Sequence, residues 1–212
     1  MTHLLHLDSS ARRRSFSREL TARHARTWRA AHPAGGYAYR DLASEPVPVI
    51  GEAWTEICDA LLADGITDPA RYAEVVRTPQ QRAAWAVVEP LLAELLAADV
   101  VLVGAPMYNY SVPAALKAWI DQVTFPRMSL RGRAFVVAGA RGGTYTAGTP
   151  RAAVDHHERY LRDLIAGHFD VTDVRFLHAE WTNARVDPHL AAREGERVAS
   201  RTAALRAAEE VA

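Results

Sequence analysis

The segment Asp99–Ala105 constrains the fold of this chain more than any other part of the sequence. From Val100 on it is apolar throughout, as expected of a strand in a parallel sheet that is covered on both faces. Four further strands are predicted at Leu4–Leu7, Tyr37–Leu42, Ala134–Ala138 and Val171–His178. Segments with helical spacing separate the strands, and such alternation indicates a parallel sheet with helices on both sides.

Capping residues next to each helix start predict where several helices begin. Ser17 is the expected N-cap of the first helix, Thr78-Pro79-Gln80-Gln81 is a capping box, and Asp187-Pro188 begins the last helix. We expect the helix after Thr78 to be interrupted or kinked near Pro90. The predicted helices are Arg18–Ala31, Glu52–Ala63, Thr78–Ala97, Pro113–Val123, Pro150–Ile165 and one from Asp187 nearly to the end.

Size and composition narrow the class of protein. The 212 residues suit one α/β domain spanning 1–212, and the 25 basic and 25 acidic residues cancel, so bulk charge gives no reason to expect nucleic acid or a membrane surface as partner. Cys58 is the only cysteine, and no apolar stretch approaches the roughly 20 residues of a membrane span. His156-His157-Glu158 lacks the spacing of a helical metal site. We therefore expect a reduced, cytoplasmic setting and no metal.

Five strands in this alternation favour a flavodoxin-like three-layer sandwich, with a parallel sheet of order 2-1-3-4-5, over a six-stranded dinucleotide fold. Ligands of such sheets bind beyond the carboxyl ends of the strands. The loops that follow strands one, three and four are therefore where a site is expected.

The loop after the first strand, Asp8–Ser17, enters the N-terminus of a helix, where free N–H groups attract anions. The hydroxyls of Ser10, Ser15 and Ser17 can donate to phosphate, or they can simply cap the helix. It carries no glycine pattern of a dinucleotide fold or nucleotide hydrolase. One of Arg12-Arg13-Arg14 can support phosphate binding, or all three can form a solvated basic loop.

The other two loops have different chemistry. Pro106–Pro113 contains Met107, Tyr108, Asn109 and Tyr110, and is either a stiff apolar wall for a flat ring or a loop whose aromatic side chains pack onto helices. Gly139–Tyr145 contains adjacent glycines, which let backbone N–H groups approach a ligand closely. Together the three loops indicate one ligand site.

The stretch Ala105–Tyr110, with Pro113 and Leu116–Asp121 behind it, closely resembles the FMN-dependent NADH:quinone oxidoreductases known as azoreductases. Ser9-Ser10 with Ser15-Phe16-Ser17 is similar to that family's phosphate loop, and Ala140–Gly143 to its Ser-Arg-Gly-Gly turn. The resemblance implies a flavodoxin-like homodimer that binds FMN, takes hydride from NADH or NADPH, and passes it to a quinone or azo compound. No catalytic side chain is required, because the flavin carries the chemistry.

Roles carried over by this resemblance fall into four groups. They are phosphate binding for Ser10, Ser15, Phe16 and Ser17, ring walls for Met107, Tyr108, Asn109 and Tyr110, the polar ring edge for Ala140, Arg141, Gly142 and Gly143, and the substrate pocket for Phe125 and Tyr145.

The chain also departs from the family pattern. The segment Phe125–Gly132 is shorter than usual and Glu52–Arg77 is enlarged, so we expect a retained flavin site and a rebuilt substrate wall. Two other functions therefore stay open. One is a flavin reductase dedicated to a specialised metabolite, and the other is a flavodoxin-type electron carrier, which the neutral charge disfavours.

Overall fold

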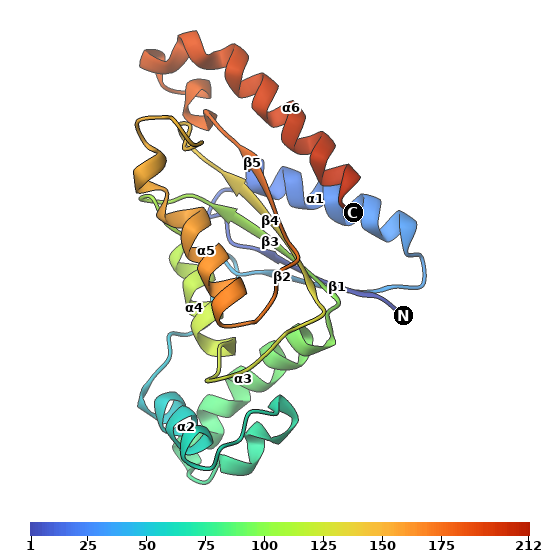
Figure 1. Ribbon diagram of the computed structural model, residues 1–212, viewed down its shortest axis with the longest axis vertical. Coiled ribbons are helices and arrows are strands. Elements are labelled where there is room, and N and C mark those ends of the chain that lie inside the picture. The colour runs from blue at the N-terminus through green and yellow to red at the C-terminus, as the bar shows by residue number, and fades with distance from the viewer.

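Five parallel strands form one sheet in the computed structural model, which describes residues 1–212 (Figure 1). Their order is β2-β1-β3-β4-β5, which confirms the predicted flavodoxin-like arrangement. The strands are β1 (His3–Asp8), β2 (Gly36–Asp41), β3 (Val100–Pro106), β4 (Ala134–Ala140) and β5 (Val174–Ala179).

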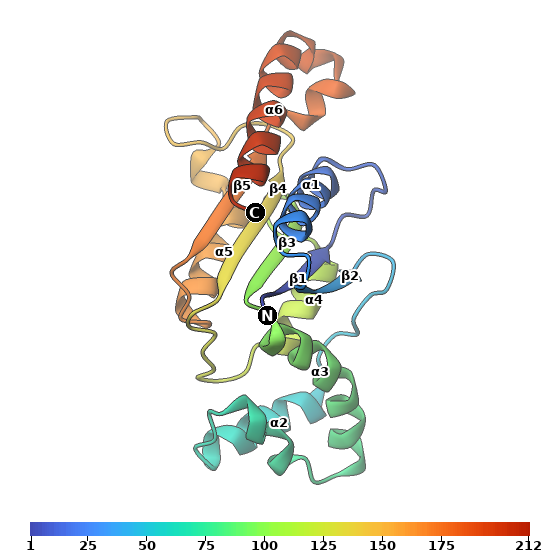
Figure 2. The ribbon, with the colours of Figure 1, turned by 90° about the vertical axis from the view of Figure 1, so that its right-hand side faces the viewer.

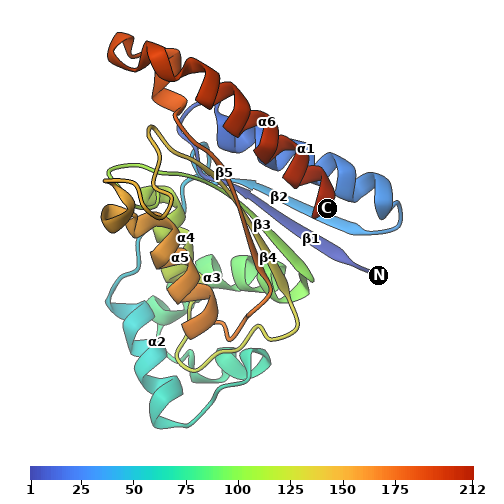
Figure 3. The same ribbon diagram turned by 45° about the horizontal axis from the view of Figure 1, so that its top comes forward.

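Helices cover both faces of the sheet. Figure 3 shows α1 and α6 side by side over one face, with α3, α4 and α5 on the other. The helices are α1 (Phe16–Ala31), α2 (Glu52–Ala63), α3 (Pro79–Ala97), α4 (Ala114–Val123), α5 (His156–Gly167) and α6 (Glu194–Glu210). Short 3₁₀ segments add η1 (Pro69–Val75), η2 (Ala152–Val154), η3 (Thr182–Arg185) and η4 (Pro188–Arg193).

Alternation along the central strands divides the core into two layers. Because successive side chains of a strand point to opposite faces, Leu5 and Leu7 pack with α3, α4 and α5, whereas Leu4 packs with α1 and α6. Val101 and Leu102 of β3 divide in the same way. The apolar sequence of β3 thus reflects burial on both faces.

Several helix boundaries differ from the sequence prediction. The Thr78–Gln81 capping box is present, but α3 runs uninterrupted across Pro90. The helix expected from Pro150 begins at His156 instead, with Asp155 accepting from two backbone N–H groups. Asp187 caps η4, and α6 follows only at Glu194. For α5 and α6, a 3₁₀ turn or a nearer capping side chain replaces the expected start.

The segment formed by α2 and η1 lies at the opposite end of the molecule from α6 (Figure 2). It packs against α3 and adds Ile57, Leu61 and Tyr72 to the larger core cluster. This segment corresponds to the stretch that the sequence indicates as enlarged. No helix combines the length and the apolar character that crossing a bilayer requires.

Candidate functional site

A cavity of about 340 Å³ lies among the loops that follow the strands. Its volume falls within the range of small-molecule sites, about 300–1,000 Å³. The loops after β1, β3 and β4 all contribute to it, as predicted from the sheet order. The site residues predicted from sequence that line it are Ser10, Ser15, Phe16, Met107, Tyr108, Asn109, Tyr110, Ala140, Gly142 and Tyr145.

Ser15, rather than Ser17, is the N-cap of α1. The Ser15 backbone is extended, and its Oγ accepts from the Arg18 N–H at 3.2 Å. Ser17 is fully buried behind it, with its hydroxyl 3.2 Å from that of Ser15. The predicted cap at Ser17 is therefore wrong, and the Ser17 side chain does not line the cavity.

One end of the cavity is suited to a phosphate group. The N–H groups of residues 13–17 donate no hydrogen bond within the chain, and they lie at the positive end of a 16-residue helix. The Arg12 and Arg14 side chains line the same end, and no carboxylate lines the cavity. Free N–H groups and arginines together favour a phosphate dianion.

The aromatic loop after β3 is a tight turn. Tyr108 and Ser111 exchange two backbone hydrogen bonds of 3.0 Å, while Asn109 and Tyr110 both have positive φ, at 49° and 67°. Two such residues in succession match a type I′ turn, and this conformation is costly for residues other than glycine. Strain of this kind is found where a site demands a particular backbone.

Contacts join the aromatic loop to its neighbours. The Tyr108 hydroxyl accepts from the Ala11 N–H at 3.2 Å, which connects it to the first loop. The Tyr110 ring is 45% exposed and meets the Tyr145 ring edge-on, with centroids 6.3 Å apart. Tyr110 and Tyr145 therefore form an aromatic wall of the cavity.

The turn after β4 presents free backbone donors. Because β4 extends through Ala140, Gly139 and Ala140 belong to the strand and not to the loop. The N–H groups of residues 142–144 have no acceptor within the chain, whereas the carbonyls of Gly142 and Gly143 accept from residues after β5. Of these three residues only Gly142 lines the cavity, where its N–H can bond the polar edge of a ring.

The Arg141 side chain faces away from the cavity, which corrects its expected contact with the ligand. It is 2% exposed and lies 3.0 Å from Asp155 and 3.1 Å from Glu158. A hydrogen bond from His178, reinforced by Arg162 and Arg141, lowers the pKa of Glu158 to about 2. Arg141 is thus a buried anchor beneath the glycine turn.

Phe125 also lies elsewhere than expected. Its side chain has no exposed surface. The centroid of its ring lies 4.8 Å from that of Tyr72 and 5.4 Å from that of Trp54. The α2–η1 segment covers it, so the prediction that Phe125 lines the substrate pocket is wrong. The hydrophobic effect places this ring in the core.

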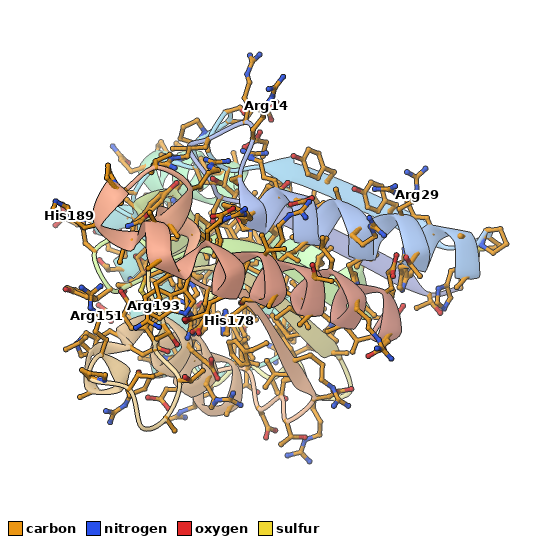
Figure 4. The ribbon with its side chains drawn as sticks, turned by 90° about the horizontal axis from the view of Figure 1, so that it is seen from above. Arg14, Arg29, Arg151, His178, His189 and Arg193 are labelled. Carbon is orange, nitrogen blue, oxygen red and sulfur yellow. The ribbon has the colours of Figure 1, made fainter.

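Four residues of the cavity were missed by sequence reasoning: Arg151, Thr182, Asn183 and Arg185. Arg151 precedes η2, and the other three follow β5, which pairs with β4. The polar Thr182-Asn183 pair after the fifth strand was an available signal, because that loop opens at the same edge of the sheet. Figure 4 shows Arg14 at the upper edge of the molecule and Arg151 at its left edge.

Comparison with known proteins shows to which family the chain belongs. A family model described as a flavodoxin-like fold matches residues 2–202. A Nocardia farcinica protein named FMN-dependent NADH:quinone oxidoreductase is 66% identical over 205 residues, which cover 97% of this chain and 95% of that protein. This chain belongs to the FMN-dependent NADH:quinone oxidoreductase family. A family protein from Streptomyces coelicolor is 39% identical over 199 residues, covering 90% of this chain and 84% of its own.

Solved structures share the fold of this family member. An azoreductase from Bacillus anthracis str. Sterne superposes with a TM-score of 0.75 at 23% identity, covering 99% of this chain and all of its own. An FMN-dependent NADH-azoreductase from Bacillus anthracis str. Ames Ancestor, in complex with FMN, has a TM-score of 0.76 at 17% identity, with full coverage of both chains. At these identities the likeness establishes the fold.

Proposed function

We propose that this chain, as a single domain of residues 1–212, is an FMN-dependent NADH:quinone oxidoreductase. The observation that carries the proposal is one cavity with free backbone donors at both ends, in a chain 66% identical to a protein of that name. The reductase is favoured over the electron carrier because relatives named as reductases match nearly the whole chain.

The residues of the cavity match the parts of FMN. The free N–H groups of residues 13–17, with Arg12, Arg14 and Ser15, would hold the phosphate. The strained turn Met107–Tyr110 would flank the ring, and the free N–H of Gly142 would bond its polar edge. Ser10 and Tyr108, whose hydroxyl oxygens lie 3.5 Å apart, would join the two ends.

The chemistry then divides between the cofactor and the chain. When bound, FMN would supply the hydride-transfer chemistry between NADH and the acceptor. The chain holds FMN and, with Tyr110 and Tyr145, provides an apolar wall beside which planar substrates stack in turn. NADH, a proton and a quinone give NAD⁺ and a hydroquinone, and azo compounds are the second acceptor class that we propose.

The setting and assembly of the enzyme also belong to this proposal. A single, buried cysteine suits a reducing cytoplasm. The resemblance of Ala105–Asp121 to the family supports a homodimer with its sites near the interface. Sedimentation of the purified protein at micromolar concentration should give twice the 23.3 kDa mass of one chain.

A spectroscopic test checks the function directly. We expect the purified protein to be yellow with about one FMN per chain, to be bleached by NADH without oxygen, and to regain its colour when a quinone is added. A colourless protein that takes up no FMN on titration would contradict the proposal. A stable blue semiquinone on titration with dithionite would instead favour the electron carrier.

A further inference from the structure

A second cavity, of about 640 Å³, adjoins the cofactor cavity at the start of α1. The two cavities share Arg14, Ser15, Phe16 and Arg185 as a common wall. We call the second cavity the arginine groove, because six arginines line it: Arg13, Arg14, Arg18, Arg185, Arg197 and Arg201.

Three of these arginines are neutralised by carboxylates. Arg18 lies 2.6 Å from Asp41 and 3.5 Å from Asp8, Arg197 pairs with Glu194, and Arg201 pairs with Glu19. They hold the wall of the arginine groove in place and add little net charge to it.

The other three, Arg13, Arg14 and Arg185, form no ion pair. The guanidinium groups of Arg185 and Arg197 lie 5.2 Å and 5.7 Å from the centre of the Phe16 ring. Arg185 is therefore held over an aromatic ring and keeps its charge unpaired at the wall between the cavities. The arginine groove thus carries surplus positive charge.

The triplet Arg12-Arg13-Arg14 is divided between the two cavities. Arg12 lines only the cofactor cavity, Arg13 lines only the arginine groove, and Arg14 lines both. In Figure 4, Arg14 lies at the outer edge of the molecule, beyond the body of the sheet. The Arg13 side chain therefore lies outside the cofactor cavity, and Arg13 contributes only its backbone N–H to the proposed phosphate site.

We propose that the arginine groove binds the pyrophosphate of the dinucleotide electron donor. This inference rests on the function proposed above, in which the donor brings its nicotinamide into the cofactor cavity. A quinone carries no charge for the arginines to attract, whereas the pyrophosphate carries two negative charges. The shared wall puts the arginine groove directly next to the cofactor cavity, at the end where α1 begins, and unpaired arginines suit phosphate oxygens.

The matched test compares Arg13→Glu with Arg29→Glu in the holoenzyme. Arg29 lies on α1 outside the arginine groove and forms no ion pair, so its reversal changes the net charge equally. We expect Arg13→Glu to raise KM for NADH about five- to tenfold, since an exposed charge pair contributes up to about fivefold and reversal adds a repulsion. KM for the quinone should stay within about twofold in both variants, because the charge reversal leaves a neutral substrate unaffected.

Binding of ADP, which carries the same pyrophosphate, gives a readout that needs no turnover. In calorimetry we expect ADP to bind the wild type and to bind Arg13→Glu several-fold more weakly, and in kinetics ADP should compete with NADH. Equal KM values for NADH in the two variants would overturn the inference, as would the absence of ADP binding. Inhibition by inorganic phosphate as strong as that by ADP would mean a site for phosphate alone and would also overturn it.

Failure of the two proposals can be told apart. If the protein is yellow and is bleached by NADH, but does not bind ADP and its KM for NADH is unchanged by Arg13→Glu, the proposed function stands and the inference about the arginine groove is wrong. If the protein binds ADP, and binds it more weakly after Arg13→Glu, but takes up no FMN, the arginine groove is a pyrophosphate site and the proposed function is wrong.

Discussion

Gly142 and Gly143 are neighbours in the turn after β4, yet only one of them has no room for a methyl group. A Cβ on Gly142 would lie 2.6 Å from Nδ2 and 2.9 Å from Cγ of Asn183. On Gly143 the nearest atom would be Nη1 of Arg151 at 3.3 Å, which is the movable end of a long side chain. At the residue scale, the close approach of Asn183 therefore determines which glycine is needed.

We expect Gly142→Ala to weaken FMN binding about tenfold, equivalent to about 1.4 kcal/mol. The added methyl group must displace Asn183 or the turn, and with it the free N–H groups of residues 142–144. Titration followed by quenching of flavin fluorescence measures this, with Gly143→Ala as the control that stays within about threefold of wild type. Equal loss in the two variants would show that spacing to Asn183 is unimportant.

At the element scale, Arg141 connects three parts of the fold. It follows β4, it lies within 3.1 Å of Asp155 and Glu158 at the start of α5, and it lies 3.6 Å from Glu180 after β5. Figure 1 shows these elements as neighbours at one side of the sheet. A buried charge is tolerated because it is surrounded by carboxylates, and removing it leaves them uncompensated.

Arg141→Ala should therefore lower the free energy of unfolding by about 3–5 kcal/mol, the usual cost of breaking a buried ion pair. Urea denaturation measures the effect. The control is Arg131→Ala, whose pair with Asp170 is exposed and should cost less than about 1 kcal/mol. Similar losses of unfolding free energy in both variants would mean that the buried ion pairs of Arg141 stabilise the fold no more than an exposed pair does.

Across the whole molecule, two buried histidines and one largely buried histidine connect stability to pH. Burial lowers the pKa of His24, His157 and His178, and it brings that of His157 to about 3. His157 lies 2.9 Å from the Ala105 carbonyl, to which its Nε2–H donates, at the end of β3. The folded chain therefore keeps these rings neutral where the unfolded chain would protonate them.

The sign of the pH effect follows from proton counts. Between pH of about 6.5 and 4.5 the unfolded chain binds more protons at these histidines than the folded chain, so stability falls as the pH falls, by about 1.4 kcal/mol per pH unit for each full proton difference. Urea midpoints measured from pH 8 to pH 5 should be level above about 7 and decline below about 6.5. His157→Gln should flatten the decline, and a profile that is flat in the wild type would contradict the assignment.

Local signals in the sequence were sufficient for the elements and the sheet order. The apolar run of β3, the Thr78–Gln81 capping box and the alternation of strands with helices all depend on near neighbours, and the structure agrees with them. The same reasoning located the site, because in a parallel sheet the loops after neighbouring strands open at one edge.

Tertiary structure alone decided where particular side chains point. Phe125 is buried because α2 and η1, from a distant part of the sequence, cover it, and Arg141 faces its carboxylates because α5 and β5 bring them there. Arg13 and Arg12 are adjacent in sequence yet line different cavities. Burial and ion pairing depend on residues far apart along the chain, so the sequence by itself determined the fold and the place of the site, and packing determined its lining.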